Sequence, residues 1–194
     1  MKKRLFLIHG WEGSSLEERY QKLELELEKL DFKVHLLDMP DTAHPKIQTW
    51  VSYLKKQVKS PDENTYFVGN SVGCQTILRY LETLPEKAKV GGVVFSAGWF
   101  TLKLIIFEEG PEVVAISKPW LETPINFKKI LTHTSDFTAI FSDDDPFVPL
   151  SDARLFKDKL KAKIIIEKNK GHFPGYEKGK KLSVIAEEIL LMAS

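Results

Sequence analysis

The sequence predicts an α/β fold of three layers, in which a doubly wound, mainly parallel sheet of about six strands is covered by helices on both faces. Short apolar runs that are typical of strands alternate with segments whose apolar residues recur at helical spacing. The strand-like runs are apolar throughout, which indicates a parallel sheet buried on both faces. The 194 residues suit a single domain, 1–194. The six predicted strands comprise residues 5–8, 32–37, 66–68, 90–97, 137–142 and 163–167.

The first strand ends at a glycine-containing loop that begins with His9. Ser15 and Glu18 have the spacing of a capping box, which predicts the start of a helix. The apolar stripe of this helix comprises Leu16, Tyr20, Leu23, Leu27 and Leu30. After the second strand, Pro45 is well placed as the first residue of another helix. The residues of that helix that we expect to face inward are Ile47, Trp50, Leu54 and Val58.

The segment 65–84 changes its hydrophobic period, and the predicted site is arranged around it. Residues 66–68 form an apolar, strand-like run, whereas apolar residues from Cys74 onward recur at helical spacing. Between the two stands Gly69-Asn70-Ser71-Val72-Gly73, a G-x-S-x-G motif at a strand-to-helix turn. Such a turn exposes the serine and requires small neighbours two residues away. The motif therefore predicts that Ser71 is a nucleophile; the alternative is a glycine-rich turn with a surface serine.

A long aromatic-rich segment, residues 98–136, interrupts the alternation of strands and helices. It is too long for a simple crossover. Aromatic side chains at the carboxyl end of a parallel sheet are suited to a substrate wall, and an ordinary crossover helix with irregular flanks is the alternative. Within this segment, Trp99 and Trp120 are the candidate substrate-binding residues. The chain then continues with a strand, a helix near residues 151–160, another strand, and a closing helix that contains Leu182 and Ile185.

The composition argues against several classes of protein. Lys and Arg number 28 and Asp and Glu number 27, and the few arginines are scattered, so no nucleic-acid partner is expected. Cys74 is the single cysteine, so no intrachain disulfide can form. The apolar stretch near the N-terminus is too short for a membrane span or a signal peptide. We expect a cytoplasmic protein that uses neither a cofactor nor a metal ion.

A serine hydroxyl is a weak nucleophile at neutral pH, so Ser71 needs a base, and the base needs an acceptor that fixes its tautomer. His172 follows the last predicted strand, at the same edge of the sheet as Ser71. His9 is expected to shape the loop after the first strand. The other histidines are expected to be structural or exposed; they are His35, His44 and His133.

The acceptor for the histidine is expected at the end of the preceding strand, where Asp143, Asp144 and Asp145 stand in a row. Three adjacent carboxylates cannot all be buried and paired. We favour Asp145, because Pro146 fixes the backbone directly after it. The resulting chain order of serine, acid and histidine is that of the α/β-hydrolase fold.

Two backbone amides are the candidate donors to the oxyanion of a tetrahedral intermediate. The amide of Val72 lies at the start of the nucleophile helix, and that of Trp11 lies in the loop after the first strand. Phe147, which follows the acid, is a further candidate for contact with a substrate.

Four segments resemble the compact, lid-poor α/β-hydrolases of the retinoblastoma-binding serine hydrolase family and its bacterial relatives. They are His9–Gly13, Gly69–Gly73, Asp144–Pro149 and Gly171–Phe173. The resemblance covers nearly the whole chain. It implies a shortened hydrolase sheet, a catalytic triad of Ser71, Asp145 and His172, and serine hydrolase or carboxylesterase activity on a poorly defined substrate.

The predicted function is therefore metal-independent hydrolysis of a small ester-like substrate through an acyl-enzyme. The second hypothesis is a hydrolase fold without useful turnover that acts as a protein-binding module. A nucleotide-binding, flavodoxin-like domain would also fit the strand pattern. However, neither glycine-containing segment is a phosphate-binding motif.

Overall fold

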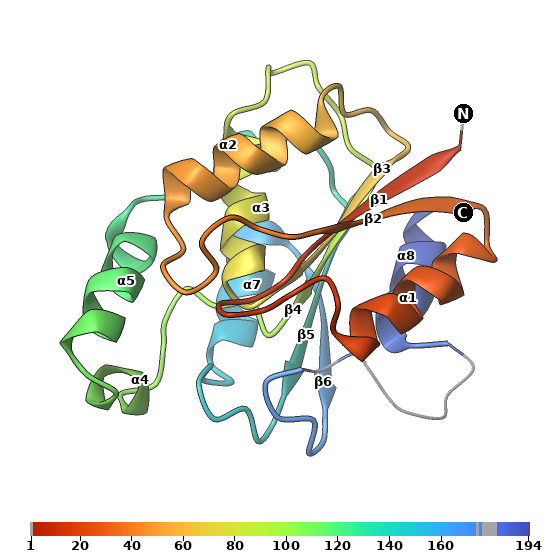
Figure 1. Ribbon diagram of the computed structural model, residues 1–194. Helices are drawn as coiled ribbons and strands as arrows, with labels where there is room; N and C mark the ends of the chain where they lie inside the picture. Colours follow the sequence, from red (N-terminus) through yellow and green to blue (C-terminus); the bar gives the residue numbers. More distant parts are fainter. Residues whose placement is uncertain (1, 174, 176–181) are drawn as a thin grey trace.

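The computed structural model describes residues 2–173, 175 and 182–194, and in these a single parallel sheet forms the centre of the molecule (Figure 1). The six strands lie in the order β2-β1-β3-β4-β5-β6, and each neighbouring pair is parallel. Their bounds are β1 Lys3–Ile8, β2 Phe32–Leu37, β3 Thr65–Asn70, β4 Gly92–Ser96, β5 Phe137–Ser142 and β6 Lys163–Glu167. The predicted fold class is confirmed, and each predicted strand is present with small shifts at its ends.

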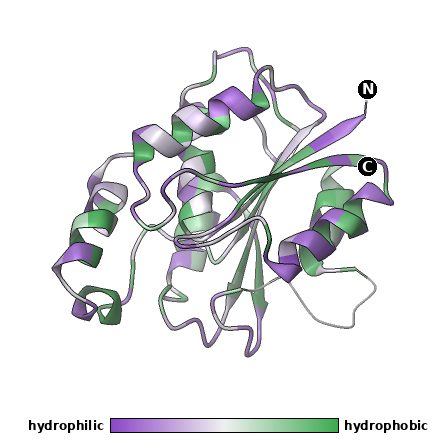
Figure 2. Ribbon diagram, in the orientation of Figure 1, coloured by the Kyte–Doolittle hydropathy of each residue, from purple (hydrophilic) through white to green (hydrophobic). Residues whose placement is uncertain are grey.

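Helices cover both faces of this sheet and complete the three layers (Figure 1). One face carries α1 (Glu18–Glu28) and α8 (Val184–Met192), and the other carries α2 (Ile47–Val58), α3 (Val72–Glu82) and α7 (Asp152–Leu160). Each face has its own cluster of buried apolar side chains. The strands between the two clusters are hydrophobic along much of their length (Figure 2). This burial on both faces explains why the inner strands β3, β4 and β5 are buried along their whole length. The edge strand β2 instead alternates, with Phe32 and Val34 buried and Lys33 exposed.

The order of the strands places a crevice at the carboxyl ends of β1 and β3. From β1 the chain first adds β2 on one side and then returns to add β3 on the other side. At such a reversal the loops after the two strands diverge to opposite faces of the sheet, which opens a ligand-binding crevice. The loop that begins with His9 and the turn that contains Ser71 follow these two strands directly.

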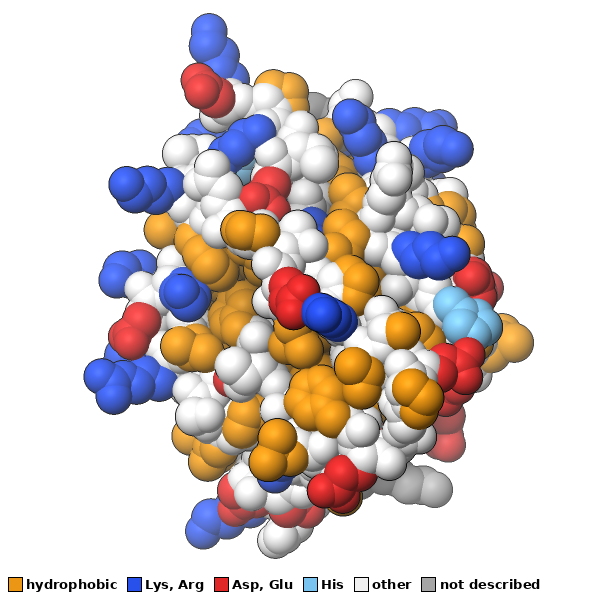
Figure 3. Space-filling model, turned by 90° about the vertical axis from the view of Figure 1, so that its left-hand side faces the viewer, with side chains coloured by type: hydrophobic (Ala, Val, Ile, Leu, Met, Phe, Trp, Pro, Cys, Tyr) orange, Lys and Arg blue, Asp and Glu red, His pale blue; other side chains and the backbone are white. Residues whose placement is uncertain are grey.

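The segment 98–136 folds as three short helices with irregular connections. These are α4 (Ile105–Glu108), α5 (Pro111–Glu122) and α6 (Phe127–Ile130). Helices α4 and α5 stand to one side of the sheet, beyond the start of α2 (Figure 1). Hydrophobic side chains are spread across the middle of the molecular face on that side (Figure 3). At the start of α4, Leu104 and Ile105 are 78% and 52% exposed.

The predicted start of the first helix was wrong. Helix α1 begins at Glu18, and Ser15 makes no capping box with it. Instead, the Ser15 amide donates to the Asp38 carboxylate at 3.0 Å, which ties this segment to the end of β2. Of the predicted apolar stripe, Leu16 is 75% and Leu30 39% exposed, and only the three central members are buried. The tertiary contact with Asp38 therefore overrides the local capping signal.

The second helix also begins later than predicted, at Ile47 rather than Pro45. Lys46 has an extended backbone, with φ −115° and ψ 132°, so the proline precedes the first turn. Ile47 is only partly buried, whereas the other three predicted inward residues are fully buried; they are Trp50, Leu54 and Val58.

Candidate active site

Ser71 stands at the tight turn between β3 and α3, and its backbone is strained. Its φ of 52° and ψ of −119° are unusual for a residue with a side chain. Two glycines make the turn possible: a Cβ on Gly69 would lie 2.7 Å from the Cys74 amide nitrogen, and a Cβ on Gly73 would lie 2.3 Å from the Ile8 carbonyl oxygen. Helix α3 can therefore begin directly against the end of β1, with Ser71 at the carboxyl edge of the sheet.

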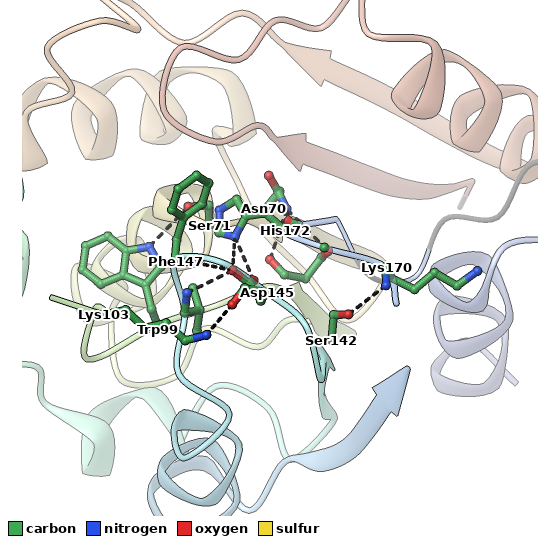
Figure 4. A network of polar contacts seen from close by, with 12 residues as sticks. Asn70, Ser71, Trp99, Lys103, Ser142, Asp145, Phe147, Lys170 and His172 are labelled. Atoms are coloured by element: carbon green, nitrogen blue, oxygen red, sulfur yellow. Dashed lines mark hydrogen bonds and ion pairs between the residues drawn. The ribbon is translucent and has the colours of Figure 1, made fainter. Parts of the chain in front are cut away.

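The Asp145 carboxylate and the His172 imidazole are hydrogen-bonded to each other near this turn (Figure 4). Nδ1 of His172 lies 2.8 Å from Oδ2 and 3.0 Å from Oδ1 of Asp145. Oδ1 also accepts hydrogen bonds from the amides of Phe147 at 2.8 Å and Val148 at 3.0 Å. Because these amides hold the buried carboxylate in place, it keeps the proton of a neutral imidazole on Nδ1 and leaves Nε2 as an acceptor.

The two neighbouring carboxylates hold the loop that follows β6. Asp144 accepts hydrogen bonds from the Ser142 hydroxyl at 2.5 Å and the Gly171 amide at 2.8 Å. These hydrogen bonds, that of Ser142 above all, lower the pKa of Asp144. Asp143 accepts a hydrogen bond from the Asn169 amide at 2.9 Å. Each of the three consecutive acids thus has different partners, and two of them fix the loop in which the histidine lies.

Ser71 and His172 line the same cavity, which has a volume of about 360 Å³. The predicted oxyanion and substrate residues that also line it are Trp11, Val72, Trp99 and Phe147. The segment 98–136 contributes further side chains to the wall, namely Leu102, Ile106, Glu109 and Val113. The carboxyl ends of β1, β3, β4 and β5 and the loop after β6 therefore meet around one hollow that is largely apolar.

Trp120 is not part of this cavity. It is 2% exposed, packs against Trp50 with ring centroids 6.3 Å apart, and donates its indole hydrogen to the Pro45 carbonyl at 2.9 Å. The prediction that Trp120 contacts a substrate does not fit this position. The physical reason is that α5 turns this side chain inward, onto the hydrophobic cluster beneath α2.

Trp11 and Val72 both line the cavity, and within the described residues neither of their amides donates a backbone hydrogen bond. His9 determines the direction of the Trp11 amide. The Met39 amide donates to His9 Nε2 at 3.1 Å, so the proton of the neutral ring is on Nδ1, which donates to the Gly10 carbonyl at 2.8 Å. In a trans peptide the carbonyl and the next N–H point in opposite directions, so the Trp11 N–H points away from His9.

Burial lowers the pKa of His9 and so favours the neutral ring that this arrangement requires. A protonated ring would present a second N–H to the Met39 amide, where an acceptor is needed. His9 therefore shapes the loop after β1, which is the role that the sequence suggested for it.

Two polar side chains that sequence reasoning did not assign to the site connect its parts. The Asn70 amide group donates to the Ser96 carbonyl at 3.3 Å and, over a longer 3.5 Å, to the His172 carbonyl. The Lys103 ammonium group donates to the Asp145 carbonyl at 2.6 Å. Both contacts join segments that are far apart in the sequence, so no local pattern could have indicated them.

Charged side chains surround the mouth of the cavity. Arg19 forms an ion pair with Glu17, and its guanidinium lies over the Phe173 ring, 3.3 Å from the centroid. The positive charge of Arg19 is therefore already paired with Glu17 and the Phe173 ring. Glu12 and Glu109 also line the cavity and are exposed. The mouth thus has an acidic balance that disfavours anionic ligands.

The remaining histidines and the cysteine lie outside the cavity. His35 stacks on an aromatic ring of β1, His44 is exposed between two carboxylates, and His133 is buried against a backbone carbonyl. Cys74 is fully buried, its thiol contacts the Gly69 carbonyl at 3.2 Å, and burial raises the pKa of the thiol. Cys74 is thus a packing residue of α3, as the sequence indicated.

Across residues 2–173, 175 and 182–194, no three side chains of the metal-ligating types gather into a group that could hold an ion. No helix in this part of the chain combines the length and the apolar character that crossing a membrane requires.

The parallel sheet, its strand order and the strained turn after β3 define an α/β-hydrolase fold, and comparisons with known proteins identify the family. The chain belongs to the serine hydrolase family, whose sequence profile matches residues 5–181. This result confirms the family resemblance inferred from the four sequence motifs.

Two curated relatives cover most of the chain. The putative hydrolase YdeN of Bacillus subtilis is 27% identical over 173 residues, which are 89% of this chain and 87% of that protein. The crystal structure of the ydeN gene product superimposes with a TM-score of 0.78, at 26% identity over 88% of both chains. The serine hydrolase RBBP9 of Rattus norvegicus is 25% identical over 171 residues, 87% of this chain and 81% of that one.

A crystal structure from the thaumarchaeon Nitrososphaera gargenis, described in a study of its carboxylesterases, shares the fold with a TM-score of 0.64. The identity is 15%, over 88% of this chain and 83% of that chain. At this identity the likeness concerns the fold alone.

Proposed function

We propose that the protein is a serine hydrolase of the carboxylesterase type, which cleaves a small ester or a related acyl substrate. The observation that carries the proposal is the hydrogen bond between Asp145 and His172 in the cavity that Ser71 also lines. This bond leaves Nε2 of the histidine as the basic nitrogen. Membership of the serine hydrolase family supports the same conclusion.

In the proposed mechanism, Ser71 Oγ attacks the carbonyl carbon of the substrate while its proton passes to Nε2 of His172. The electron pair of the carbonyl bond moves to the oxygen, which the amides of Val72 and Trp11 stabilise. The intermediate collapses, and His172 returns the proton to the departing alcohol. Water then repeats the sequence on the acyl-enzyme and releases the acid. Asp145 stays ionised throughout and stabilises the imidazolium.

The cavity supports a proposal for the class of substrate. A volume of about 360 Å³ accommodates a small or medium-sized molecule. Its apolar wall, which includes Trp99, Leu102 and Phe147, suits an apolar acyl or alcohol group. The acidic balance at the mouth favours neutral over anionic esters. The protein partner of the second hypothesis finds no comparable support in these contacts.

The proposal is tested by labelling with a fluorophosphonate probe, read by intact mass, beside hydrolysis of short-chain p-nitrophenyl esters. We expect one adduct on the wild type and none on Ser71→Ala. Ser52→Ala is the matched control, because Ser52 is an exposed serine of α2, and it should label as the wild type does. A folded wild type that neither labels nor hydrolyses esters would refute the proposed function and favour the protein-binding hypothesis.

A further inference from the structure

The indole of Trp99 contacts the nucleophile itself. Its Nε1–H donates a hydrogen bond to Ser71 Oγ at 3.3 Å, and in Figure 4 the indole nitrogen points toward the serine. Trp99 is 3% and Ser71 9% exposed, so this contact is shielded from bulk water. An apolar wall requires no hydrogen bond. The contact of the single polar atom of the indole with Ser71 Oγ therefore points to a role beyond that of a wall.

The backbone that carries Trp99 is held from two sides. The Gln75 side chain, 1% exposed, donates to the Trp99 carbonyl at 2.8 Å. The fully buried Asp152 carboxylate accepts from the amides of Phe100 at 2.5 Å and Thr101 at 2.9 Å. Gln75 lies in α3 and Asp152 opens α7, so the loop after β4 is fixed to two helices. The backbone from which the indole projects toward Ser71 is therefore fixed before any substrate arrives.

The hydrogen-bonding capacity of the two groups determines what this contact does. A serine hydroxyl has one donor hydrogen and two acceptor positions, whereas an indole nitrogen is a donor only. The indole therefore occupies an acceptor position of Ser71 Oγ and can never take the hydroxyl hydrogen. The hydroxyl hydrogen is left for another acceptor, and Nε2 of His172 is the basic nitrogen at this cavity.

We propose that Trp99 is a functional hydrogen-bond donor to the nucleophile: its indole N–H fixes the orientation of Ser71 Oγ and stabilises the negative charge that develops there. The inference rests on the proposed hydrolase function. As the proton of Ser71 passes to His172, Oγ becomes more negative, and the hydrogen bond from the indole strengthens. In the acyl-enzyme the same oxygen belongs to an ester and accepts weakly. It regains charge when it leaves in the second half of the reaction.

This role differs from that of a wall in a measurable way. Loss of a donor to Oγ should lower the rate constants of all substrates by the same factor, because the oxygen is the same in each reaction. Loss of an apolar wall should lower them by a factor that depends on the size of the group that packs against it. The test therefore needs a side chain that keeps the area of the indole and removes its N–H. Benzothienylalanine, in which sulfur replaces the indole nitrogen, meets this requirement when it is incorporated at position 99. Trp99→Phe also removes the N–H, but it loses part of the ring area.

The measured quantities are the second-order rate constant of Ser71 labelling by a small fluorophosphonate and kcat/KM for p-nitrophenyl acetate, butyrate and hexanoate. We expect the benzothienylalanine variant to lose about 3- to 10-fold in each, by the same factor for all three esters. Trp120→Phe is the control, because it removes an indole hydrogen bond of 2.9 Å outside the cavity. It should lower thermal stability and leave these rate constants unchanged.

Two results would overturn the inference. One is a benzothienylalanine variant that labels and turns over at the wild-type rate. The other is a loss that grows or shrinks with the length of the acyl chain, which would identify Trp99 as a wall alone. If the probe does not label the wild type, the proposed function itself is refuted. If it labels the wild type and the benzothienylalanine variant at the same rate, only the inference about Trp99 is refuted.

Discussion

Replacement of Asp145 by asparagine tests which of the three consecutive acids orients the histidine. In Asp145→Asn the oxygen that accepts from the amides of Phe147 and Val148 is retained, because both amides bind Oδ1. The new amide group then replaces Oδ2, the oxygen 2.8 Å from Nδ1 of His172. This group donates hydrogen, and its position is nearer to Nδ1 than that of the retained oxygen, at 2.8 Å against 3.0 Å. We therefore expect Nδ1 to become the acceptor and the proton of the neutral ring to move to Nε2.

A histidine in that tautomer cannot take the proton of Ser71. In Ser-His-Asp enzymes the wrong tautomer costs about 10⁴-fold in rate, or about 5.5 kcal/mol of transition-state stabilisation. The free energy of unfolding should change by only about 1 kcal/mol, because the two backbone hydrogen bonds survive. Activity and stability should therefore separate clearly in this variant.

The assay is kcat/KM for p-nitrophenyl acetate, with thermal unfolding measured on the same samples. Asp143→Asn is the matched control: its oxygen can keep the hydrogen bond from the Asn169 amide, so we expect a loss of less than about threefold. The reasoning fails if Asp145→Asn keeps more than about a tenth of wild-type activity while Asp143→Asn loses most of it.

Three further predictions concern groups around the site. Burial lowers the pKa of His9 in the folded protein below its unfolded value of about 6.5. Between these two pKa values the unfolded chain binds a proton at His9 and the folded protein does not. The contribution of His9 to the free energy of unfolding is therefore fully present above about pH 6.5 and is lost as the pH falls. Thermal unfolding between about pH 7 and pH 5 should show a shallower decline in His9→Gln than in the wild type. Gly73→Ala should lower the free energy of unfolding by about 2 kcal/mol or more, measured by urea denaturation, since its Cβ would meet the Ile8 carbonyl; an unchanged midpoint would contradict this. Cys74 should resist a thiol reagent in the native protein and react after denaturation, and rapid native labelling would show that the thiol is accessible.

The sequence predicted those features that local patterns encode. Continuous apolar runs gave all six strands, and the change of period around Ser71 placed the turn after β3. The position of His172 after the last strand and of Asp145 after the preceding one was enough to expect them at one edge, because parallel strands end together. The structure brings these two side chains into contact.

Features that depend on tertiary contacts were not predictable. The start of α1 is set by the contact of Ser15 with Asp38, across 23 positions of sequence. Trp99 and Trp120 look alike in the sequence, yet one faces Ser71 and the other packs beneath α2. Which of the two indoles reaches the cavity depends on the path of the chain between them. The spacing of apolar residues in the sequence does not predict that path.

The wholly parallel sheet also has a consequence for how the protein reaches its native state. Among the six strands of the described residues, no two neighbours can be joined by a hairpin, so each of these pairings closes a crossover and spans a long stretch of sequence. Pairings of this kind form slowly. The groups that surround Ser71 follow β1, β3, β4, β5 and β6, so they come together only when nearly the whole sheet has assembled. If the proposed function holds, a partly folded chain carries an ordinary, unreactive serine, and labelling of Ser71 would report the completion of folding.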